Sequence, residues 1–272
     1  MKYKKVWAMY FSPTGTTKKI VTNIAKEVAH GIEAELSTLD FTPPMVRNEG
    51  NSFSENDIVI FGVPVYAGRV PNVLLEYLSK VIGGGAIAVP VVLFGNRNYD
   101  DALIELRNIL HNNGFSPVAA GAFIGEHSFS RILGKNRPDE RDLKVATEFA
   151  SEIANKIITG NFGNIPVEVK GENSLRGYYK PRDMKENIID IRKVKPKTND
   201  KCNNCGICVK VCPMGSISSE NVREYTGICI KCGACIKKCP QNAKYYDDEN
   251  YLYHKKDLEE EFQRRAEPET FL

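Results

Sequence analysis

Residues 6–20 read Val-Trp-Ala-Met-Tyr-Phe-Ser-Pro-Thr-Gly-Thr-Thr-Lys-Lys-Ile, and this stretch decides the fold of the first part of the chain. Its first six residues form a short apolar run, which is typical of a buried parallel strand. Residues Thr16–His30 then show helical spacing of apolar side chains, and Gly31 marks the end of that helix. A strand that passes through a hydroxyl-rich turn into a helix is expected to open an α/β domain.

The chain after this unit repeats the same alternation. Further apolar runs at 34–36, 58–63, 86–94 and 118–124 predict strands, and helical patterns appear at 73–78, 101–110 and 139–158. Strand and helix therefore alternate about five times. This pattern predicts an α/β fold with a doubly wound, parallel, five-stranded sheet and helices on both faces.

The turn after the first strand is a candidate anion site. It places hydroxyl groups beside the N-terminus of a helix, where backbone N–H groups attract phosphate, and its glycine allows close approach. Neither G-x-x-x-x-G-K-[ST] nor G-x-G-x-x-G occurs, so one phosphomonoester, as in FMN, fits better than a triphosphate or a dinucleotide. An ordinary capped turn is the plainer interpretation, but four hydroxyls in six positions argue against it. The expected phosphate ligands are Ser12, Thr14, Gly15, Thr16 and Thr17.

The turn resembles the flavodoxin pattern [ST]-x-T-G-x-T, which Ser12, Thr14, Gly15 and Thr17 match position by position. The resemblance implies FMN at the carboxyl ends of the strands, next to the loops 62–69 and 95–100. It also implies that Tyr99 covers one face of the flavin. The residues expected to contact the flavin in these loops are Pro64, Val65, Tyr66, Ala67, Gly68, Gly95, Asn96, Arg97 and Tyr99.

Three polar residues near the expected flavin have open roles. Arg97 either stabilises an anionic reduced flavin or pairs with a neighbouring aspartate. Arg69 is the last residue of the first flavin loop, with no role assigned. His127 follows the last predicted strand and faces the flavin rim, faces the second module, or is structural.

All eight cysteines lie between Cys202 and Cys239, in two copies of C-x2-C-x2-C-x3-C-P that are offset by 27 positions. This run is the pattern of a bacterial two-cluster ferredoxin. Structural zinc usually takes two separated C-x2-C pairs and fits it poorly, as do disulfides in a reducing compartment. Gly206 and Gly233 recur at the same place in each copy and let the backbone bend close to a cluster.

Residues 200–246 therefore resemble the bacterial two-[4Fe–4S] ferredoxins. The resemblance implies one cluster on Cys202, Cys205, Cys208 and Cys239, and a second on Cys229, Cys232, Cys235 and Cys212. The whole chain resembles the flavodoxin–ferredoxin fusion proteins of anaerobic bacteria and archaea, called flavoferredoxins. This resemblance implies FMN and two [4Fe–4S] clusters as cofactors.

The expected organisation is a flavodoxin-like domain at 1–160, a proline-punctuated linker at 161–201, a cluster module of α+β type at 202–246 and an acidic tail at 247–272. Residues 161–246 hold 16 basic and 8 acidic groups, whereas the tail holds 4 and 9. We expect this basic segment to balance anionic clusters through Lys210, Lys231, Lys237 and Lys238, not to bind nucleic acid. Neither a signal peptide nor an apolar stretch of about 20 residues is visible, which predicts a cytoplasmic protein without a membrane span.

The leading functional hypothesis is an electron-transfer protein that relays electrons between its clusters and FMN, and to or from a redox partner such as a ferredoxin or an oxidoreductase. The reason for this hypothesis is that the sequence shows no recognisable substrate site, so no catalytic residue is expected. An alternative is an FMN-dependent reductase of a quinone or nitro compound, fed by the clusters. A redox sensor is a third class, with little support in the residues. The donor, the acceptor, the direction of flow and the oligomeric state stay open.

Overall fold

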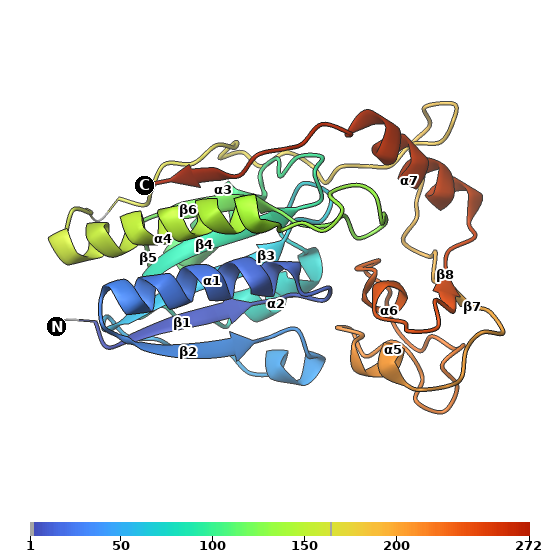
Figure 1. The fold of residues 1–272 in the computed structure, drawn as a ribbon, viewed down its shortest axis with the longest axis horizontal. Coiled ribbons are helices and arrows are strands. Elements are labelled where there is room, and N and C mark those ends of the chain that lie inside the picture. Colours follow the sequence, from blue (N-terminus) through green and yellow to red (C-terminus); the bar gives the residue numbers. More distant parts are fainter. Residues whose placement is uncertain (1–2, 164) are drawn as a thin grey trace.

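Five parallel strands form the central sheet of the computed structural model, which describes residues 3–163 and 165–272 (Figure 1). Their order across the sheet is β2-β1-β3-β4-β6, and a two-residue strand β5 (Ser116–Pro117) also pairs with β4. This order is that of a doubly wound, flavodoxin-like sheet and confirms the predicted fold class. The strands are β1 (Lys5–Tyr10), β2 (Glu35–Asp40), β3 (Asp57–Pro64), β4 (Ile87–Phe94) and β6 (Ala120–Ile124).

Helices cover both faces of this sheet. The helices α1 (Thr16–Gly31) and α4 (Glu140–Thr159) pack together on one face, over inward side chains such as Val6 and Ile58. The other face is covered by α3 (Ala102–Asn112) and by the short η2 (Asn72–Leu74) and α2 (Leu75–Leu78). Buried β3 and β4 are apolar almost throughout, as expected for strands that are covered on both sides.

The C-terminal tail packs back against the flavodoxin-like domain and adds a strand to its sheet. The tail forms helix α7 (Glu249–Glu261), and its strand β9 (Glu269–Phe271) pairs antiparallel with β6. The expectation of a sheet with only five strands is therefore corrected. β9 covers the edge of β6 that would otherwise present unpaired backbone groups.

The cysteine-rich module lies beyond the carboxyl ends of the parallel strands (Figure 1). It contains two equivalent short helices, α5 (Ile207–Lys210) and α6 (Ala234–Lys237), each preceded by a glycine with positive φ, as the repeat predicted. A small sheet of β7 (Lys197–Thr198) and β8 (Lys244–Tyr245) closes the module. Because β7 lies before residue 201, the module begins slightly earlier than the expected boundary.

Two basic side chains join the module to the flavodoxin-like domain. Lys237 at the end of α6 donates to the carbonyl oxygens of His127 and Ser130, at 2.6 and 2.9 Å, and pairs with Glu126. Arg47, in the turn η1 (Pro44–Arg47) after β2, donates to the carbonyl oxygen of Pro213. These bonds tie the carboxyl edge of the sheet to both halves of the repeat.

None of the described helices is both long enough and apolar enough to cross a membrane.

Candidate functional site

The turn between β1 and α1 leaves the N-terminus of α1 open towards a cavity. Gly15 is the N-cap of the helix and has φ 96°. Because glycine has no side chain, nothing from this residue covers the amides of the first turn, which lack intrahelical acceptors. The Ser12 hydroxyl accepts from the Lys18 amide at 2.9 Å, which holds the turn closed from below. Thr14, Thr16 and Thr17 reach the cavity itself.

We call this space the hydroxyl cavity. A second wall comes from the loop after β6, where Gly125 faces Thr16 so closely that an added Cβ would lie 2.9 Å from its Cβ. Glu126 also lines it, with its carboxylate paired to Lys237. The lining residues are Pro13, Thr14, Thr16, Thr17, Pro64, Val65, Tyr66, Leu93, Phe94, Gly95, Gly125, Glu126, His127, Ser128 and Cys232.

A larger cavity of about 190 Å³ continues from the hydroxyl cavity, and we call it the roofed cavity. The loops after β3 and β4 form its floor and walls, and the linker, the cysteine module and α7 contribute the opposite side. The two cavities share Val65, Tyr66, Phe94, Gly95, His127 and Ser128. The remaining lining residues of the roofed cavity are Ala67, Gly68, Arg97, Asn98, Phe129, Tyr179, Pro181, Ile191, Ile230, Lys231, His254 and Leu258.

The shape and chemistry of this joined space fit FMN. Hydroxyls and free helix amides at one end suit a phosphate, and the mostly apolar lining at the other end suits an aromatic ring system. Tyr66 lies where the two spaces join, at the start of a tight turn in which Ala67 and Gly68 have φ 52° and 77°. Burial, followed by the nearby Cys232 and Cys229, raises the pKa of the Tyr66 phenol well above its ordinary value.

Most residues that the sequence predicted for this site are brought together. Those that line the joined space are Thr14, Thr16, Thr17, Pro64, Val65, Tyr66, Ala67, Gly68, Gly95 and Arg97. Ser12 and Gly15 shape the turn beneath it without lining it. Arg97 is held by a pair with Asp100 and lies over the Tyr179 ring, 4.4 Å from its centroid. Arg69 instead pairs with Glu105 at 2.7 Å, away from the cavity.

Tyr99 and Asn96, which the sequence predicted for the flavin site, do not line the joined space. Tyr99 is 4% exposed, packs against Phe94, and donates its hydroxyl to Glu269 of β9 at 2.9 Å. Asn96 turns its side chain towards the tail, donating to the carbonyl oxygens of Phe262 and Arg264. Both residues serve the unpredicted return of the C-terminus to the sheet.

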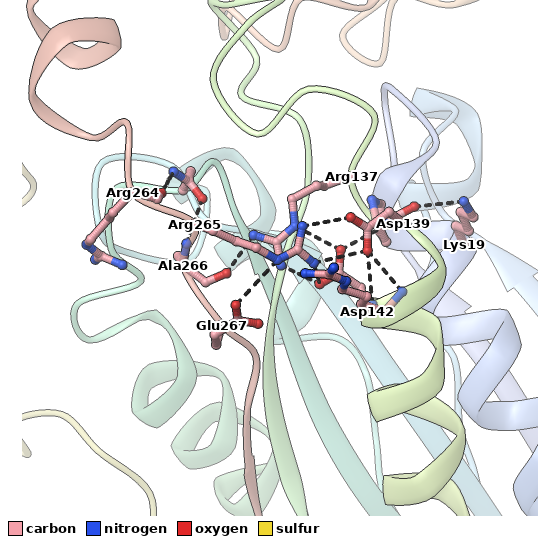
Figure 2. Close-up of polar contacts among 11 residues, drawn as sticks. Lys19, Arg137, Asp139, Asp142, Arg264, Arg265, Ala266 and Glu267 are labelled. Atoms are coloured by element: carbon pink, nitrogen blue, oxygen red, sulfur yellow. Dashed lines mark hydrogen bonds and ion pairs between the residues drawn. The ribbon is translucent and has the colours of Figure 1, made fainter.

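The C-terminal segment is clamped beside this loop by a buried charge cluster (Figure 2). Arg137, 5% exposed, pairs with the fully buried Asp142 and donates to the Ala266 carbonyl oxygen at 2.6 Å. Arg265 adds an ion pair with Asp139 at 2.7 Å. The clamp positions α7, and with it His254 and Leu258, over the roofed cavity.

The linker is the other part of the roof that the sequence did not predict in detail. Arg176 pairs with Asp101 at the start of α3, and the Tyr179 amide donates to the Ala67 carbonyl oxygen at 2.9 Å. The Tyr179 ring stacks on His254, with centroids 5.8 Å apart. The segment around Leu175–Tyr179 therefore docks on the flavodoxin-like domain.

The eight cysteines line two separate cavities, each with four thiols. We call them the outer and the inner cysteine cavity, because Cys205 of the first is exposed, whereas Cys232 of the second is 9% exposed. The outer cavity is lined by Cys202, Cys205, Cys208 and Cys239. The inner cavity is lined by Cys212, Cys229, Cys232 and Cys235.

The two cysteine cavities are built alike. The Ser216 amide donates to the Cys212 sulfur at 3.4 Å, and the Ala243 amide, 27 positions later, donates to the Cys239 sulfur at 3.3 Å. Such N–H···S bonds tune iron–sulfur potentials.

Two lysines of the module, Lys231 and Lys237, make specific hydrogen bonds. Lys237 donates to carbonyl oxygens of the 126–130 loop, and Lys231 donates to the carbonyl oxygens of Arg192 and Cys229. Lys244 lines the outer cavity and donates to the Val222 carbonyl oxygen at 2.5 Å, although its position in the sequence does not indicate this role. Lys210 and Lys238 stay exposed.

Comparisons with known proteins match both parts of the chain. Residues 8–126 match the model of a flavodoxin domain, and residues 201–244 match that of a 4Fe-4S dicluster domain. No curated protein sequence matches.

Solved structures that resemble the chain include two flavodoxins and an oxidoreductase. A flavodoxin from the domain Archaea is 14% identical, with a TM-score of 0.38, and covers 57% of this chain and 99% of its own. Flavodoxin 2 from Bacillus cereus is 16% identical, with a TM-score of 0.41 and coverages of 56% and 99%. An apo NADH:FMN oxidoreductase is 18% identical, with a TM-score of 0.38 and coverages of 56% and 89%.

Proposed function

We propose that this chain, which joins an N-terminal flavodoxin domain to a C-terminal 4Fe-4S dicluster domain, relays electrons between a redox partner, two [4Fe–4S] clusters and one FMN. FMN accepts one or two electrons and a [4Fe–4S] cluster passes one, so the pair forms a junction between two-electron and one-electron chemistry. The protein contributes the spacing, the shielding and the potentials of these groups.

The observation that carries this proposal is that the inner cysteine cavity shares lining residues with both cavities of the proposed flavin site. Cys232 lines both the inner cysteine cavity and the hydroxyl cavity, and Ile230 lines both the inner cysteine cavity and the roofed cavity. An FMN in the joined space and a cluster on the inner thiols would thus be separated by single side chains. This proximity supports direct electron transfer between them.

The second argument is the order of the cavities. The inner cysteines adjoin the flavin space, whereas the outer ones include the exposed Cys205. In the proposed relay, Cys202, Cys205, Cys208 and Cys239 hold the cluster that a partner reaches first. Cys212, Cys229, Cys232 and Cys235 hold the cluster that exchanges electrons with FMN.

The roof favours a carrier over a reductase of small acceptors. A reductase needs an open flavin face, but Tyr179, His254 and Lys231 line the side of the cavity that faces away from the sheet. We therefore assign the exchange with partners to the outer cluster.

Anaerobic stopped-flow spectroscopy tests the relay. Protein loaded with FMN and both clusters is mixed separately with a reduced ferredoxin, NADH or NADPH, and flavin bleaching is followed. We expect fast bleaching with the ferredoxin, and slow bleaching after Cys212→Ser, which removes a thiol of the inner cavity. Equal bleaching rates in the Cys212→Ser variant would rule out the relay, and fast bleaching by NADH or NADPH would favour the reductase.

A further inference from the structure

We propose that His127 donates a hydrogen bond from its Nε2–H to the isoalloxazine ring of bound FMN. This inference rests on the proposed FMN site and adds to it a residue from the loop after β6, outside the two loops that the sequence assigned to the ring.

The tautomer of His127 follows from its own loop. The backbone N–H of Phe129 donates to His127 Nδ1 at 3.1 Å. A backbone N–H can only donate, so Nδ1 is the bare, accepting nitrogen, and in a neutral imidazole the proton then sits on Nε2. His127 therefore presents a donor, and not an acceptor, at Nε2.

The surroundings of His127 keep the imidazole neutral. Burial, followed by the positive charges of Lys237, His254 and Arg97, lowers the pKa of His127 to about 3. The only nearby acid among the cavity-lining residues described, Glu126, is already paired with Lys237. The donor at Nε2 is thus constant throughout the neutral pH range.

The position of His127 indicates which part of FMN its Nε2–H would contact. Its side chain lines both the hydroxyl cavity and the roofed cavity, at the place where they join. The ring lies so close to the loop after β4 that a Cβ on Gly95 would come within 2.3 Å of His127 Cδ2, the carbon next to Nε2. The His127 and Phe129 rings are nearly perpendicular, with their centroids 5.1 Å apart.

Nε2 has no acceptor among the residues that the structure describes. A donor without a partner at the junction of two cavities calls for an acceptor on a ligand, since leaving it unpaired is unfavourable once the cavity is filled. Because Gly95 belongs to a loop that walls the ring end, the carbonyl oxygens and ring nitrogens of isoalloxazine are the acceptors in reach. Such a bond strengthens as the ring gains electron density, so it favours the reduced flavin.

Two substitutions in the holoprotein test the donor. His127→Leu removes it, whereas His127→Gln retains an amide N–H donor of similar reach. We expect His127→Leu to weaken FMN binding by about two- to tenfold, the range of one neutral hydrogen bond, and to lower the flavin midpoint potential. His127→Gln should keep most of both. Neither change touches the backbone carbonyl that holds Lys237, so the cluster absorbance should be unchanged.

The outcomes separate this inference from the function on which it rests. Unchanged FMN affinity and potential in His127→Leu would overturn the inference, as would weaker affinity at an unchanged potential, which would place the contact on the ribityl chain. If His127→Leu does not fold, ¹⁵N NMR of histidine in the FMN-loaded wild type decides: protonated Nε2 is expected, and protonated Nδ1 would overturn the inference. Failure of the wild type to bind FMN would instead remove the proposed function.

Discussion

Ala266 donates its backbone N–H to Oδ1 of Asn96 at 3.2 Å, although 170 positions separate the two residues. The Asn96 side chain also donates to the carbonyl oxygens of Phe262 and Arg264, at 2.8 and 2.6 Å. One buried amide thus binds three backbone groups of the C-terminal segment from a loop that walls the proposed flavin site. Through Asn96, the tail and the flavin loop become one structural unit.

The Asn96 contact predicts that a substitution in the loop releases the tail. Asn96→Ala removes three hydrogen bonds and also strains the backbone, because Asn96 has φ 70°. We expect the free energy of unfolding to fall by about 2–4 kcal/mol, measured by urea denaturation, and the tail to become sensitive to protease. Asn96→Gly tolerates the positive φ, so any loss it shows reports the hydrogen bonds alone. A stable Asn96→Gly variant with a protected tail would contradict this assignment.

Lys237 predicts how the two domains stay together. Its amine is largely buried, and the bonds to His127, Ser130 and Glu126 are its contacts across the interface. Lys237→Met leaves these oxygens without a donor, so we expect a loss of about 2–4 kcal/mol and slower electron transfer between clusters and flavin. The adjacent Lys238 is exposed and makes a matched control: Lys238→Met should change stability by less than about 0.5 kcal/mol. Equal behaviour of the two variants would refute the role of Lys237.

The parts of the site that the sequence predicted are those with a local signature. The hydroxyl turn at Thr14–Thr17 and the repeated cysteines are short motifs whose spacing reflects the geometry of one turn or one loop. Positive φ at Gly206 and Gly233 was likewise predictable, because a tight turn that approaches a cluster requires it. The alternation of apolar runs predicted the parallel sheet for the same reason.

The roof was not predictable because it depends on pairings between distant segments. Tyr99 stands at the expected position of its loop, yet the unforeseen strand β9 brings Glu269 to its hydroxyl and draws it into the core. Likewise, nothing in the polar pattern around His254 indicates a buried histidine over a cavity, since α7 gains that place from the clamp at Arg137. Neither segment has a local pattern that specifies its partner.

The interleaved cysteines predict different losses for two otherwise similar substitutions. Cys239→Ser alters the outer cavity although it lies in the second motif, and Cys212→Ser alters the inner cavity from the first motif. Each variant should lose about half of the iron, or convert one cluster, by iron analysis and EPR. Only Cys212→Ser should slow flavin reduction by dithionite-reduced clusters. If the cluster next to the flavin responded to Cys239→Ser instead, the assignment of the cavities would be reversed.

Tyr179 predicts how the protein avoids reaction with small acceptors. Its ring lines the roofed cavity, stacks on His254 and lies under the Arg97 guanidinium, so it closes the side of the site away from the sheet. Tyr179→Ala should open this side, because the small side chain leaves a gap that neither neighbour fills. We expect reoxidation of the reduced protein by a soluble quinone to accelerate severalfold, measured anaerobically by stopped flow. The neighbouring Tyr178 contacts Arg69 and does not line the cavity, so Tyr178→Ala should leave the rate unchanged. A wild type that already reacts as fast as Tyr179→Ala would mean that the roof does not shield the flavin, and would revive the reductase hypothesis.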